Sequence, residues 1–369
     1  MKRLQLCFSI LLVIMIMCFA FLNVQESQYE PSGTEPNKIN LDWPEINYIP
    51  ISSYLTNQST HDLLKPEWTL VGTDPETYKG PIVKGWPPGK SRDMRQIMVK
   101  DYVIEQCSNQ DLSGVKLFIG VKTVANRFEA RDTTRETWAS FQHNHPDVKV
   151  MFFSGEVEDR QVRNSLRTEV HTHCDLVIVH GLDTYQNVTL KTVSILSFIH
   201  DHQFGLNPEL SMIMDDDSYL NLHRLYYLTS HRLLAKPVDT ALTGFVYGGT
   251  LLRPPVDSTR KFTDPSICPT YMFKGDRFPP FLSGSGYILP RAVIPCLYEQ
   301  TRRLPFLHID DVFLTGFCAE ACGFMRITHS QFSPGHKNFD EITCHQIVLH
   351  YQSVEERLRI FQKLSKECL

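Results

Sequence analysis

Alternating strand and helix patterns in the middle of this chain constrain its fold more than any other feature. Strands are expected at residues 115–121, 148–153, 176–179 and 210–214, and helices at 130–141, 159–171 and 188–202. Such an alternation is typical of βαβ units. The strand runs are almost continuously apolar, as in strands that a parallel sheet buries on both faces. The sequence therefore predicts an α/β fold with a mostly parallel central sheet.

Three consecutive carboxylates, Asp215, Asp216 and Asp217, follow the last of these apolar runs. Hard divalent ions such as Mn²⁺ or Mg²⁺ take oxygen ligands and keep positions open for phosphate oxygens. In open α/β sheets, ligands bind at the carboxyl ends of the strands. The following residues, 218–221, lack the alternating acids and the glycine of an EF-hand. The triplet therefore predicts a site for a metal-bound nucleotide, with a solvated turn as the alternative.

The N-terminus has the pattern of a membrane anchor. Met1-Lys2-Arg3 precedes a run from Leu4 to Leu22 that only Gln5 and Ser9 interrupt. About 20 apolar residues can span a bilayer, and basic residues before the run place the N-terminus in the cytosol. We expect a type II signal anchor with a lumenal remainder; a cleaved signal peptide is the alternative. The short span favours an early secretory compartment.

Cysteines and glycosylation sequons fit an oxidising lumen. Eight cysteines follow the anchor, so disulfides are expected, although eight allow 105 full pairings. Asn57 and Asn187 begin Asn-x-Ser/Thr sequons and are candidate glycosylation sites. Asn187 is also placed to cap the helix expected at 188–202. The net charge is −4, with no basic block after residue 3, which argues against a nucleic-acid partner.

Composition divides the chain into four parts. Residues 23–112 contain nine prolines and show no periodicity, as in an extended stem. Their tryptophans suggest that the second half packs on the domain that follows. We therefore expect a cytoplasmic tail at 1–3, a transmembrane anchor at 4–22, a lumenal stem at 23–112 and a catalytic domain at 113–369.

Six short motifs follow one another within residues 115–365. They are Arg-x-x-x-Arg-x-Thr-Trp at 131–138, Asp-x-Tyr-x-Asn-Val-Thr-x-Lys at 183–191, the Asp triplet at 215–217, Gly-x-Gly-Tyr at 284–287, Asp-Asp-Val-x-x-x-Gly at 310–316 and Val-x-His at 348–350. Together they resemble the β-1,3-hexosyltransferases of glycosyltransferase family 31. This chain departs from the usual family pattern at Ile213, Asp310 and Phe281. These departures leave the metal and base carboxylates in place.

The resemblance implies a GT-A-like nucleotide-sugar-binding domain and a role for each motif. Asp311 would be the catalytic base, because inverting transfer needs a carboxylate that takes the proton of the acceptor hydroxyl. Asp217 would bind Mn²⁺ or Mg²⁺, which neutralises the UDP diphosphate, and His350 would complete its coordination. The other residues implied in donor binding are Arg131, Arg135, Asp215, Asp216, Gly284 and Gly286.

Each of these motifs also has a structural interpretation. The two arginines could pair with glutamates, the glycines could permit a tight turn, and Asp310-Asp311 could begin a helix. His350 could simply be packed in an apolar strand. For Asn187, the family motif suggests a role in packing or substrate binding.

The resemblance predicts an inverting β-1,3-galactosyltransferase of the Golgi membrane. It would move galactose from UDP-galactose to a terminal sugar of a glycoprotein or glycolipid glycan. A β-1,3-N-acetylglucosaminyltransferase that uses UDP-GlcNAc is the first alternative. Two other classes are a non-catalytic lectin-like or chaperone relative and a metal-dependent hydrolase of sugar phosphates.

Overall fold

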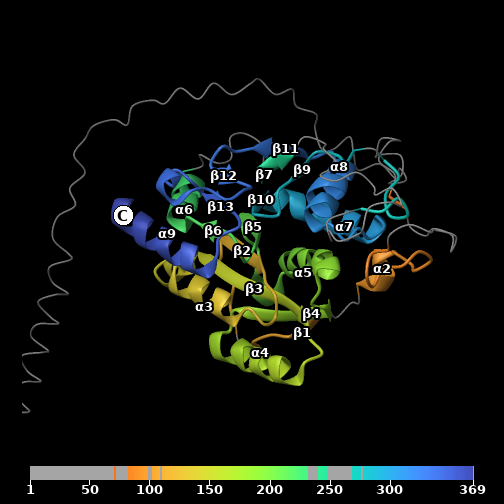
Figure 1. Ribbon diagram of the computed structural model, residues 1–369, viewed down its shortest axis with the longest axis horizontal. Helices are drawn as coiled ribbons and strands as arrows, with labels where there is room; N and C mark the ends of the chain where they lie inside the picture. The colour runs from red at the N-terminus through yellow and green to blue at the C-terminus, as the bar shows by residue number, and fades with distance from the viewer. Residues whose placement is uncertain are drawn as a thin grey trace, which may run out of the picture. The chain divides into compact units, whose positions relative to one another are not determined.

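Eight strands form the central sheet of this protein, seen in a computed structural model (Figure 1). The structure describes residues 70–71, 82–98, 102–108, 110–231, 240–247, 268–275 and 277–368. The expected tail and anchor and the Asn57 sequon lie outside these residues. Within the described ranges, no helix is long and apolar enough to cross a membrane.

The strand order of the large sheet is β1-β4-β3-β2-β5-β10-β7-β11. Strands β4, β3, β2 and β5 run parallel, whereas β10 is antiparallel to both of its neighbours and β1 closes the opposite edge antiparallel to β4. The sheet is thus mixed, with a parallel centre. Its strands are β1 (Val103–Glu105), β2 (Leu117–Lys122), β3 (Val148–Glu156), β4 (Leu176–Leu182), β5 (Leu210–Asp215), β7 (Ala241–Gly244), β10 (Tyr287–Pro290) and β11 (Met325–Thr328).

Helices cover both faces of this sheet. Neighbouring residues of β2 point to opposite faces: Phe118 joins a core with α5 and α7, whereas Ile119 joins a core with α3, α4 and α9. The helices are α2 (Met94–Ile97), α3 (Phe128–Glu136), α4 (Arg160–His173), α5 (Val188–His200), α6 (Leu222–Ser230), α7 (Ile294–Arg303), α8 (Ala319–Ala321) and α9 (Val354–Glu367). The molecule is therefore a three-layer α/β/α structure.

Short elements complete the fold beside the site. A three-stranded sheet has the order β12-β13-β6, and β8 pairs with β9. A π-helix, η7, follows Asp311 and is buried throughout. The strands are β6 (Tyr219–Leu220), β8 (Val246–Tyr247), β9 (Phe281–Leu282), β12 (Phe332–Ser333) and β13 (Val348–Leu349); the helical turns are η3 (Trp138–His143), η4 (Tyr185–Asn187), η5 (Gln203–Gly205), η6 (Arg291–Val293), η7 (Val312–Cys318) and η8 (Phe339–Glu341).

The expected strand and helix order from residue 115 to 214 is confirmed, but the expected cap at Asn187 is wrong. Asn187 precedes α5 without capping it by a side-chain hydrogen bond. Its Nδ2 instead donates to the Leu182 carbonyl, and its Oδ1 accepts from Trp86 Nε1. Thr189 of the same sequon is buried and donates to the Leu307 carbonyl. The motif thus connects segments that are distant in sequence.

The described residues before position 113 pack on the same folded unit. Trp86 is buried and stacks on Phe306, with ring centroids 4.0 Å apart, and Met94 of α2 joins the core beside α7. Strand β1 extends the large sheet. The folded unit therefore begins before the boundary that composition suggested.

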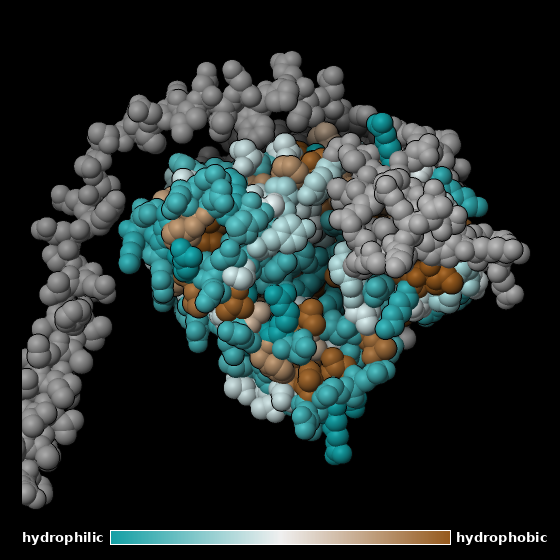
Figure 2. All heavy atoms as spheres, in the orientation of Figure 1, coloured by the Kyte–Doolittle hydropathy of each residue, from teal (hydrophilic) through white to brown (hydrophobic). Residues whose placement is uncertain are grey.

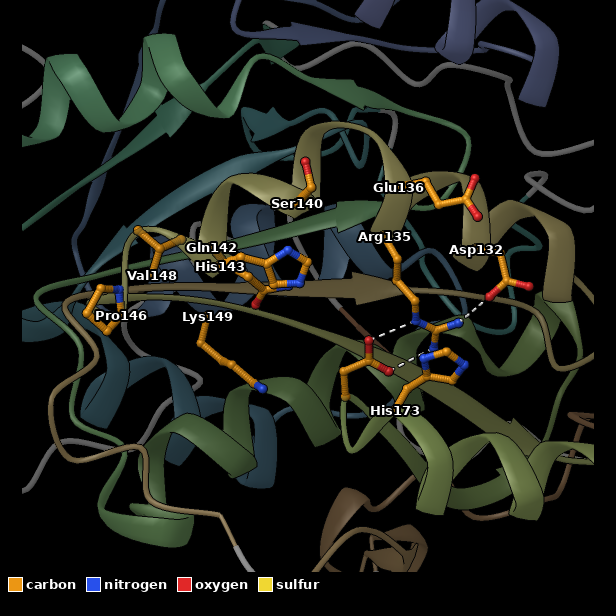
Figure 3. A pocket seen from close by; sticks show the side chains of 11 residues that line it. Asp132, Arg135, Glu136, Ser140, Gln142, His143, Pro146, Val148, Lys149 and His173 are labelled. Carbon is orange, nitrogen blue, oxygen red and sulfur yellow. Dashed lines mark hydrogen bonds and ion pairs between the residues drawn. The ribbon is translucent and has the colours of Figure 1, made fainter. Parts of the chain in front are cut away.

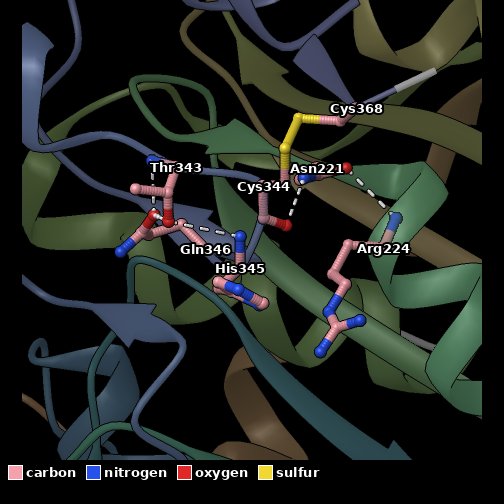
Figure 4. Close-up of a disulfide and its surroundings, with 7 residues drawn as sticks. All are labelled: Asn221, Arg224, Thr343, Cys344, His345, Gln346 and Cys368. Carbon is pink, nitrogen blue, oxygen red and sulfur yellow. Dashed lines mark hydrogen bonds between the residues drawn. A yellow bond between two sulfur atoms is a disulfide. The ribbon is translucent and has the colours of Figure 1, made fainter. Parts of the chain in front are cut away.

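Three disulfides confirm the expectation from the cysteine count. They join Cys107 to Cys174, Cys296 to Cys322, and Cys344 to Cys368. Figure 4 shows the last bond, which ties the end of α9 to the segment before β13. Cys268 and Cys318 are buried thiols.

Figure 2 shows that hydrophilic residues cover most of the visible face, with hydrophobic ones in small groups.

Candidate active site

A cleft of about 650 Å³ lies at the carboxyl ends of β2 and β5. Parallel strands deliver their last residues to the same edge of a sheet, so Lys122 and Asp215 meet there although they are far apart in sequence. Segments that follow β4 and β13 add further side chains. The residues discussed below that line the cleft are Lys122, Thr123, Val124, Arg127, Asp183, Tyr185, Lys191, Asp215, Asp216, Asp217, Tyr247, Gly284, Asp310, Asp311, His350 and Tyr351.

The three aspartates of the triplet have different surroundings. Asp216 is 5% exposed, accepts a hydrogen bond from the Thr123 hydroxyl at 2.7 Å and pairs with the Arg127 guanidinium. Asp215 and Asp217 are only partly buried and face His350. The sequence grouped Asp215 with Asp216; the structure instead groups Asp215 with Asp217.

Asp215, Asp217 and His350 form a candidate metal centre. One ligand atom from each residue lies within 4.8 Å of the others. His350 Nδ1 lies 3.1 Å from the Pro334 carbonyl, so this nitrogen carries a proton and Nε2 is the ring nitrogen that faces the aspartates. Nε2 is 3.2 Å from Asp217 Oδ1; this contact is an ion pair when the imidazole is protonated and brings two lone pairs face to face when it is neutral. Two electron-pair donors that face each other in this way fit a shared cation, and metal-binding histidines usually have such a second hydrogen bond.

The surroundings shift the pKa values of the three groups in this centre in different ways. Burial opposes the charge of His350, but Asp217 and Asp215 raise the pKa of its imidazole above the usual value. Burial also opposes ionisation of Asp217, yet His350 holds the pKa of that carboxyl below its usual range. Burial raises the pKa of Asp215 to about 6; Lys122 acts against the rise, and Asp310 and Asp217 add to it.

Short strands and a turn bring His350 to the triplet. Strand β13, just before His350, pairs antiparallel with β6, just after Asp217. The Gln352 N–H then donates to the Asp217 carbonyl at 2.8 Å. The two ends of the metal centre are therefore fixed by backbone hydrogen bonds.

Lys122 holds the acidic groups together. Its buried Nζ lies 2.9 Å from Asp215 Oδ1 and 2.6 Å from Asp310 Oδ2. Thr192 of α5 also donates to Asp310, at 2.6 Å. Burial opposes the ionisation of both Lys122 and Asp310, but their mutual attraction raises the lysine pKa and lowers that of the carboxyl. Lys122 was not predicted as a site residue, although it is a polar residue that ends a buried strand.

Asp311 lies beside this ion pair and is only partly neutralised. Its Oδ2 accepts from the Gly284 N–H at 3.1 Å and its Oδ1 from the Val312 N–H at 2.8 Å. Burial, followed by the charge of Asp310, raises the pKa of Asp311 to about 7, although Lys122 opposes the rise. A carboxylate with such a pKa can accept a proton near neutral pH. Asp311 also caps η7, so both sequence interpretations apply to it.

The two glycines of the Gly-x-Gly-Tyr motif have different neighbours. A Cβ at Gly284 would lie 3.1 Å from Asp215 Oδ2, so a side chain there would crowd the acidic centre. A Cβ at Gly286 would lie 2.5 Å from Met212 Cε, within the sheet. Gly284 therefore belongs to the cleft, whereas Gly286 allows β10 to pack against β5.

The arginine pair of the first motif turns away from the cleft. Arg131 is fully buried, bonds both oxygens of Glu169 and donates to the carbonyls of Val124 and Ala125. Figure 3 shows Arg135 in a second cavity, with bonds to Asp132 and to Asp175. Neither arginine lines the cleft. Arg131 shapes the loop after β2 that forms one wall of the cleft.

Arg127 and Lys191 are the basic residues that line the cleft in addition to Lys122. The Arg127 side chain is 38% exposed where it meets Asp216. Lys191 Nζ bridges Asp183 and the Thr123 carbonyl, at 2.8 Å each. Lys191 lies in the second sequence motif, whereas no signal in a single sequence distinguishes Arg127 from Arg131.

Comparison with known proteins identifies the class. The family model described as galactosyltransferase matches residues 129–330, more than half of the chain. The chain therefore belongs to the galactosyltransferase family, and it is a hexosyltransferase.

Two related proteins align in sequence with most of the folded unit. "Beta-1,3-galactosyltransferase 1" of Homo sapiens is 27% identical over 257 residues, which is 68% of this chain and 74% of that protein. "Lactosylceramide 1,3-N-acetyl-beta-D-glucosaminyltransferase A" of Danio rerio is 31% identical over 237 residues, 62% of this chain and 59% of that protein. Among solved structures, a glycosyltransferase involved in glycosylation of the PBCV-1 major capsid overlaps 67% of this chain and 99% of that chain, with a TM-score of 0.36 and 12% identity.

Proposed function

We propose that this protein is an inverting β-1,3-galactosyltransferase that moves galactose from UDP-galactose to a terminal sugar of a glycoprotein or glycolipid glycan. The observation that carries this proposal is the position of Asp311. It lies in one cleft with a candidate metal centre, and its pKa is raised to about 7. The name of the human relative supports galactose as the sugar transferred.

The geometry supports a single-displacement mechanism. Asp311 takes the proton of the acceptor's 3-hydroxyl as that oxygen bonds to the anomeric carbon from the face opposite UDP. The bond from the anomeric carbon to the diphosphate oxygen breaks, UDP departs with the electron pair, and the configuration inverts. Lys122 keeps Asp310 and Asp215 ionised and in place, so that Asp311 faces the acceptor in a fixed position.

The residues present fit a divalent cation. Asp215, Asp217 and His350 would hold Mn²⁺ or Mg²⁺, which would neutralise charge that develops on the UDP leaving group. Arg127 and Asp216 would contact the donor nucleotide, and Gly284 would allow close approach of the sugar. Arg131, Arg135 and Gly286, which were predicted to bind the donor, would instead act indirectly. They would hold the loop after β2 and the sheet in position.

A GT-A-like domain in a type II protein of the Golgi membrane completes the proposal. The parallel sheet centre with an acidic site at its carboxyl edge supports the first part, and the sequence of residues 1–22 supports the second. A second candidate donor is UDP-GlcNAc, which the name of the Danio rerio relative favours.

The deciding experiment is UDP release by the purified full-length chain with Mn²⁺. UDP-galactose and UDP-GlcNAc are each tested with a panel of glycan acceptors, beside Asp311→Asn and the exposed control Asp340→Asn. Acceptor-dependent release with one donor, lost only in Asp311→Asn, would support the transferase and name its sugar. Release without acceptor would indicate a hydrolase, and no release despite metal-dependent UDP binding would indicate a non-catalytic relative.

A further inference from the structure

Tyr351 has an unusual conformation for a residue of its size. It follows His350 directly, and its backbone φ is +57°, a left-handed value that costs free energy for a bulky side chain. Its ring stacks on the His350 imidazole, with centroids 3.8 Å apart and an interplanar angle of 21°. The residue nevertheless remains 60% exposed. Burial in a core therefore does not explain the conformation.

The next residue holds this turn firmly. Gln352 is 2% exposed; its N–H donates to the Asp217 carbonyl, and its side-chain amide donates to the His350 carbonyl, both at 2.8 Å. These bonds fix the backbone on the C-terminal side of Tyr351. The ring is thus presented to the cleft in one place, at the edge of the candidate metal centre.

Two more tyrosines, from other parts of the chain, line the same cleft. Tyr185 of η4 is 51% exposed, and Tyr247 of β8 is half-buried and stacks on Phe281. Burial, then the charges of Asp310 and Asp311, raises the pKa of Tyr185. Burial, then Tyr351 and Asp311, raises that of Tyr247. The three tyrosines therefore line the same cleft as Asp311, the carboxylate that would receive the acceptor's proton.

The cationic side chains of the cleft have different positions in the fold. Lys122, Arg127 and Lys191 come from the end of β2, the loop after it and α5, and each is paired with an aspartate. Aromatic rings carry no positive charge that would bind a diphosphate. They suit the face of a pyranose, whose polarised C–H bonds are attracted to the electron-rich face of a ring.

We propose that Tyr351, with Tyr185 and Tyr247, forms the platform on which the terminal sugar of the acceptor binds, and that this sugar is a neutral pyranose. An acidic sugar would meet repulsion from Asp215, Asp310 and Asp311. Stacking on one face leaves an equatorial hydroxyl at the ring edge free to reach Asp311. This inference rests on the transferase activity proposed above and adds residues that select the acceptor.

Two variants of Tyr351 test whether its ring binds the acceptor sugar or only supports the His350 side chain. Tyr351→Asn keeps a residue that tolerates positive φ but removes the ring, and Tyr351→Phe keeps the ring but removes the hydroxyl. A matched control is Tyr227→Asn, which removes a half-exposed tyrosine of α6 outside the cleft. All are made in the full-length chain.

The kinetic test is the acceptor KM with a neutral pyranoside. An aromatic contact of this kind changes binding by roughly three- to tenfold. We expect Tyr351→Asn to raise the acceptor KM by that factor. The kcat, the donor KM and the Mn²⁺ concentration at half-saturation should stay within twofold of the parent values. Tyr227→Asn should match the parent, and Tyr351→Phe, which keeps the ring, should raise the acceptor KM less than Tyr351→Asn does. An unchanged acceptor KM, or a change confined to Mn²⁺ half-saturation, overturns the proposal.

A binding measurement makes the test independent of turnover. Saturation-transfer NMR with the same pyranoside, in the presence of UDP and Mn²⁺, should show binding to the parent and Tyr351→Phe and weaker binding to Tyr351→Asn. Equal binding to all three refutes the platform. Absence of transfer by the parent, with this binding difference intact, would instead count against the proposed activity alone.

Discussion

Six aspartates of the described residues line the cleft, and two neighbours among them, Asp310 and Asp311, have different partners. Asp310 has Lys122 and Thr192 as partners, whereas Asp311 accepts hydrogen bonds from backbone N–H groups and has the charge of Asp310 beside it. Proximity alone would not separate their roles. Partner geometry makes Asp310 a structural counter-ion and leaves Asp311 as the proposed base.

The raised pKa of Asp311 predicts a pH dependence. Only the ionised carboxylate accepts a proton, so kcat/KM should rise through about pH 7 and fall by about tenfold per pH unit well below it. Initial rates between pH 5.5 and 8.5 at saturating Mn²⁺ test this. A flat profile over that range would exclude Asp311, in this environment, as the base.

Lys122 should contribute to stability as well as geometry. Lys122→Met leaves Asp215 and Asp310 without their common partner, and removal of one member of a buried ion pair costs about 3–5 kcal/mol. We expect the free energy of unfolding in urea to fall by that amount. Lys149→Met, at the second cavity, is the control and should cost much less.

Adding Asp310→Asn to Lys122→Met should recover part of this loss, because it removes one of the two uncompensated charges. A double variant with the summed cost of the two single changes would show that the pair is not coupled.

The carboxylates and His350 could be predicted from the sequence, whereas the direction of each cationic side chain could not. Arg131 and Arg127 lie one helical turn apart, yet one bonds Glu169 and the other reaches the cleft. The difference depends on where α4 presents Glu169. This position depends on the tertiary structure, which a motif in a single sequence does not specify.

At the scale of elements, the metal centre depends on strands of two residues. Strands β6 and β13 are too short to be recognised by hydrophobic periodicity, yet their pairing helps to fix His350 opposite Asp217. The longer strands and helices between residues 115 and 214 were predictable because each carries its own apolar pattern. Asn187 was not, since its partners Trp86 and Leu182 are supplied by other segments.

The disulfide between Cys344 and Cys368 should support this short sheet. It closes a loop with a sequence separation of 24, and a loop of this size contributes about 3 kcal/mol. Replacing both cysteines by serine should lower the free energy of unfolding by about that amount. It should also raise the Mn²⁺ concentration that gives half-maximal activity. Asn221, which caps α6 and donates to the Cys344 carbonyl, joins the same segment to the site (Figure 4).

The bond between Cys296 and Cys322 provides a matched control. Its sequence separation is 26, so its loss should cost a similar free energy, but it joins α7 to the end of α8. Mn²⁺ half-saturation should therefore stay unchanged in that double serine variant. Equal effects of the two replacements on the metal would refute a local role for the bond between Cys344 and Cys368.

At the scale of the whole molecule, one sheet serves two purposes. Its faces bury two apolar cores, and its carboxyl edge gathers charges that neither core could hold. Sequence patterns predicted the parallel centre because those strands are buried on both faces. The antiparallel β10 and the strands beyond it, β7 and β11, were not predicted, because strands this short carry little periodicity.

Occupation of the cleft should stabilise the entire fold, because the metal ligands come from segments that only the folded chain brings together. A ligand at about 100 times its Kd that binds only the native state adds about 2.7 kcal/mol, which for a domain of this size raises Tm by roughly 5–10 °C. We expect Mn²⁺ with UDP to produce such a shift in thermal unfolding and EDTA to reverse it. His350→Gln and Asp217→Asn should lose the shift, whereas the exposed Asp340→Asn should keep it. An equal shift in all four proteins would place the metal elsewhere, because Asp215, Asp217 and His350 are the described residues whose ligand atoms converge.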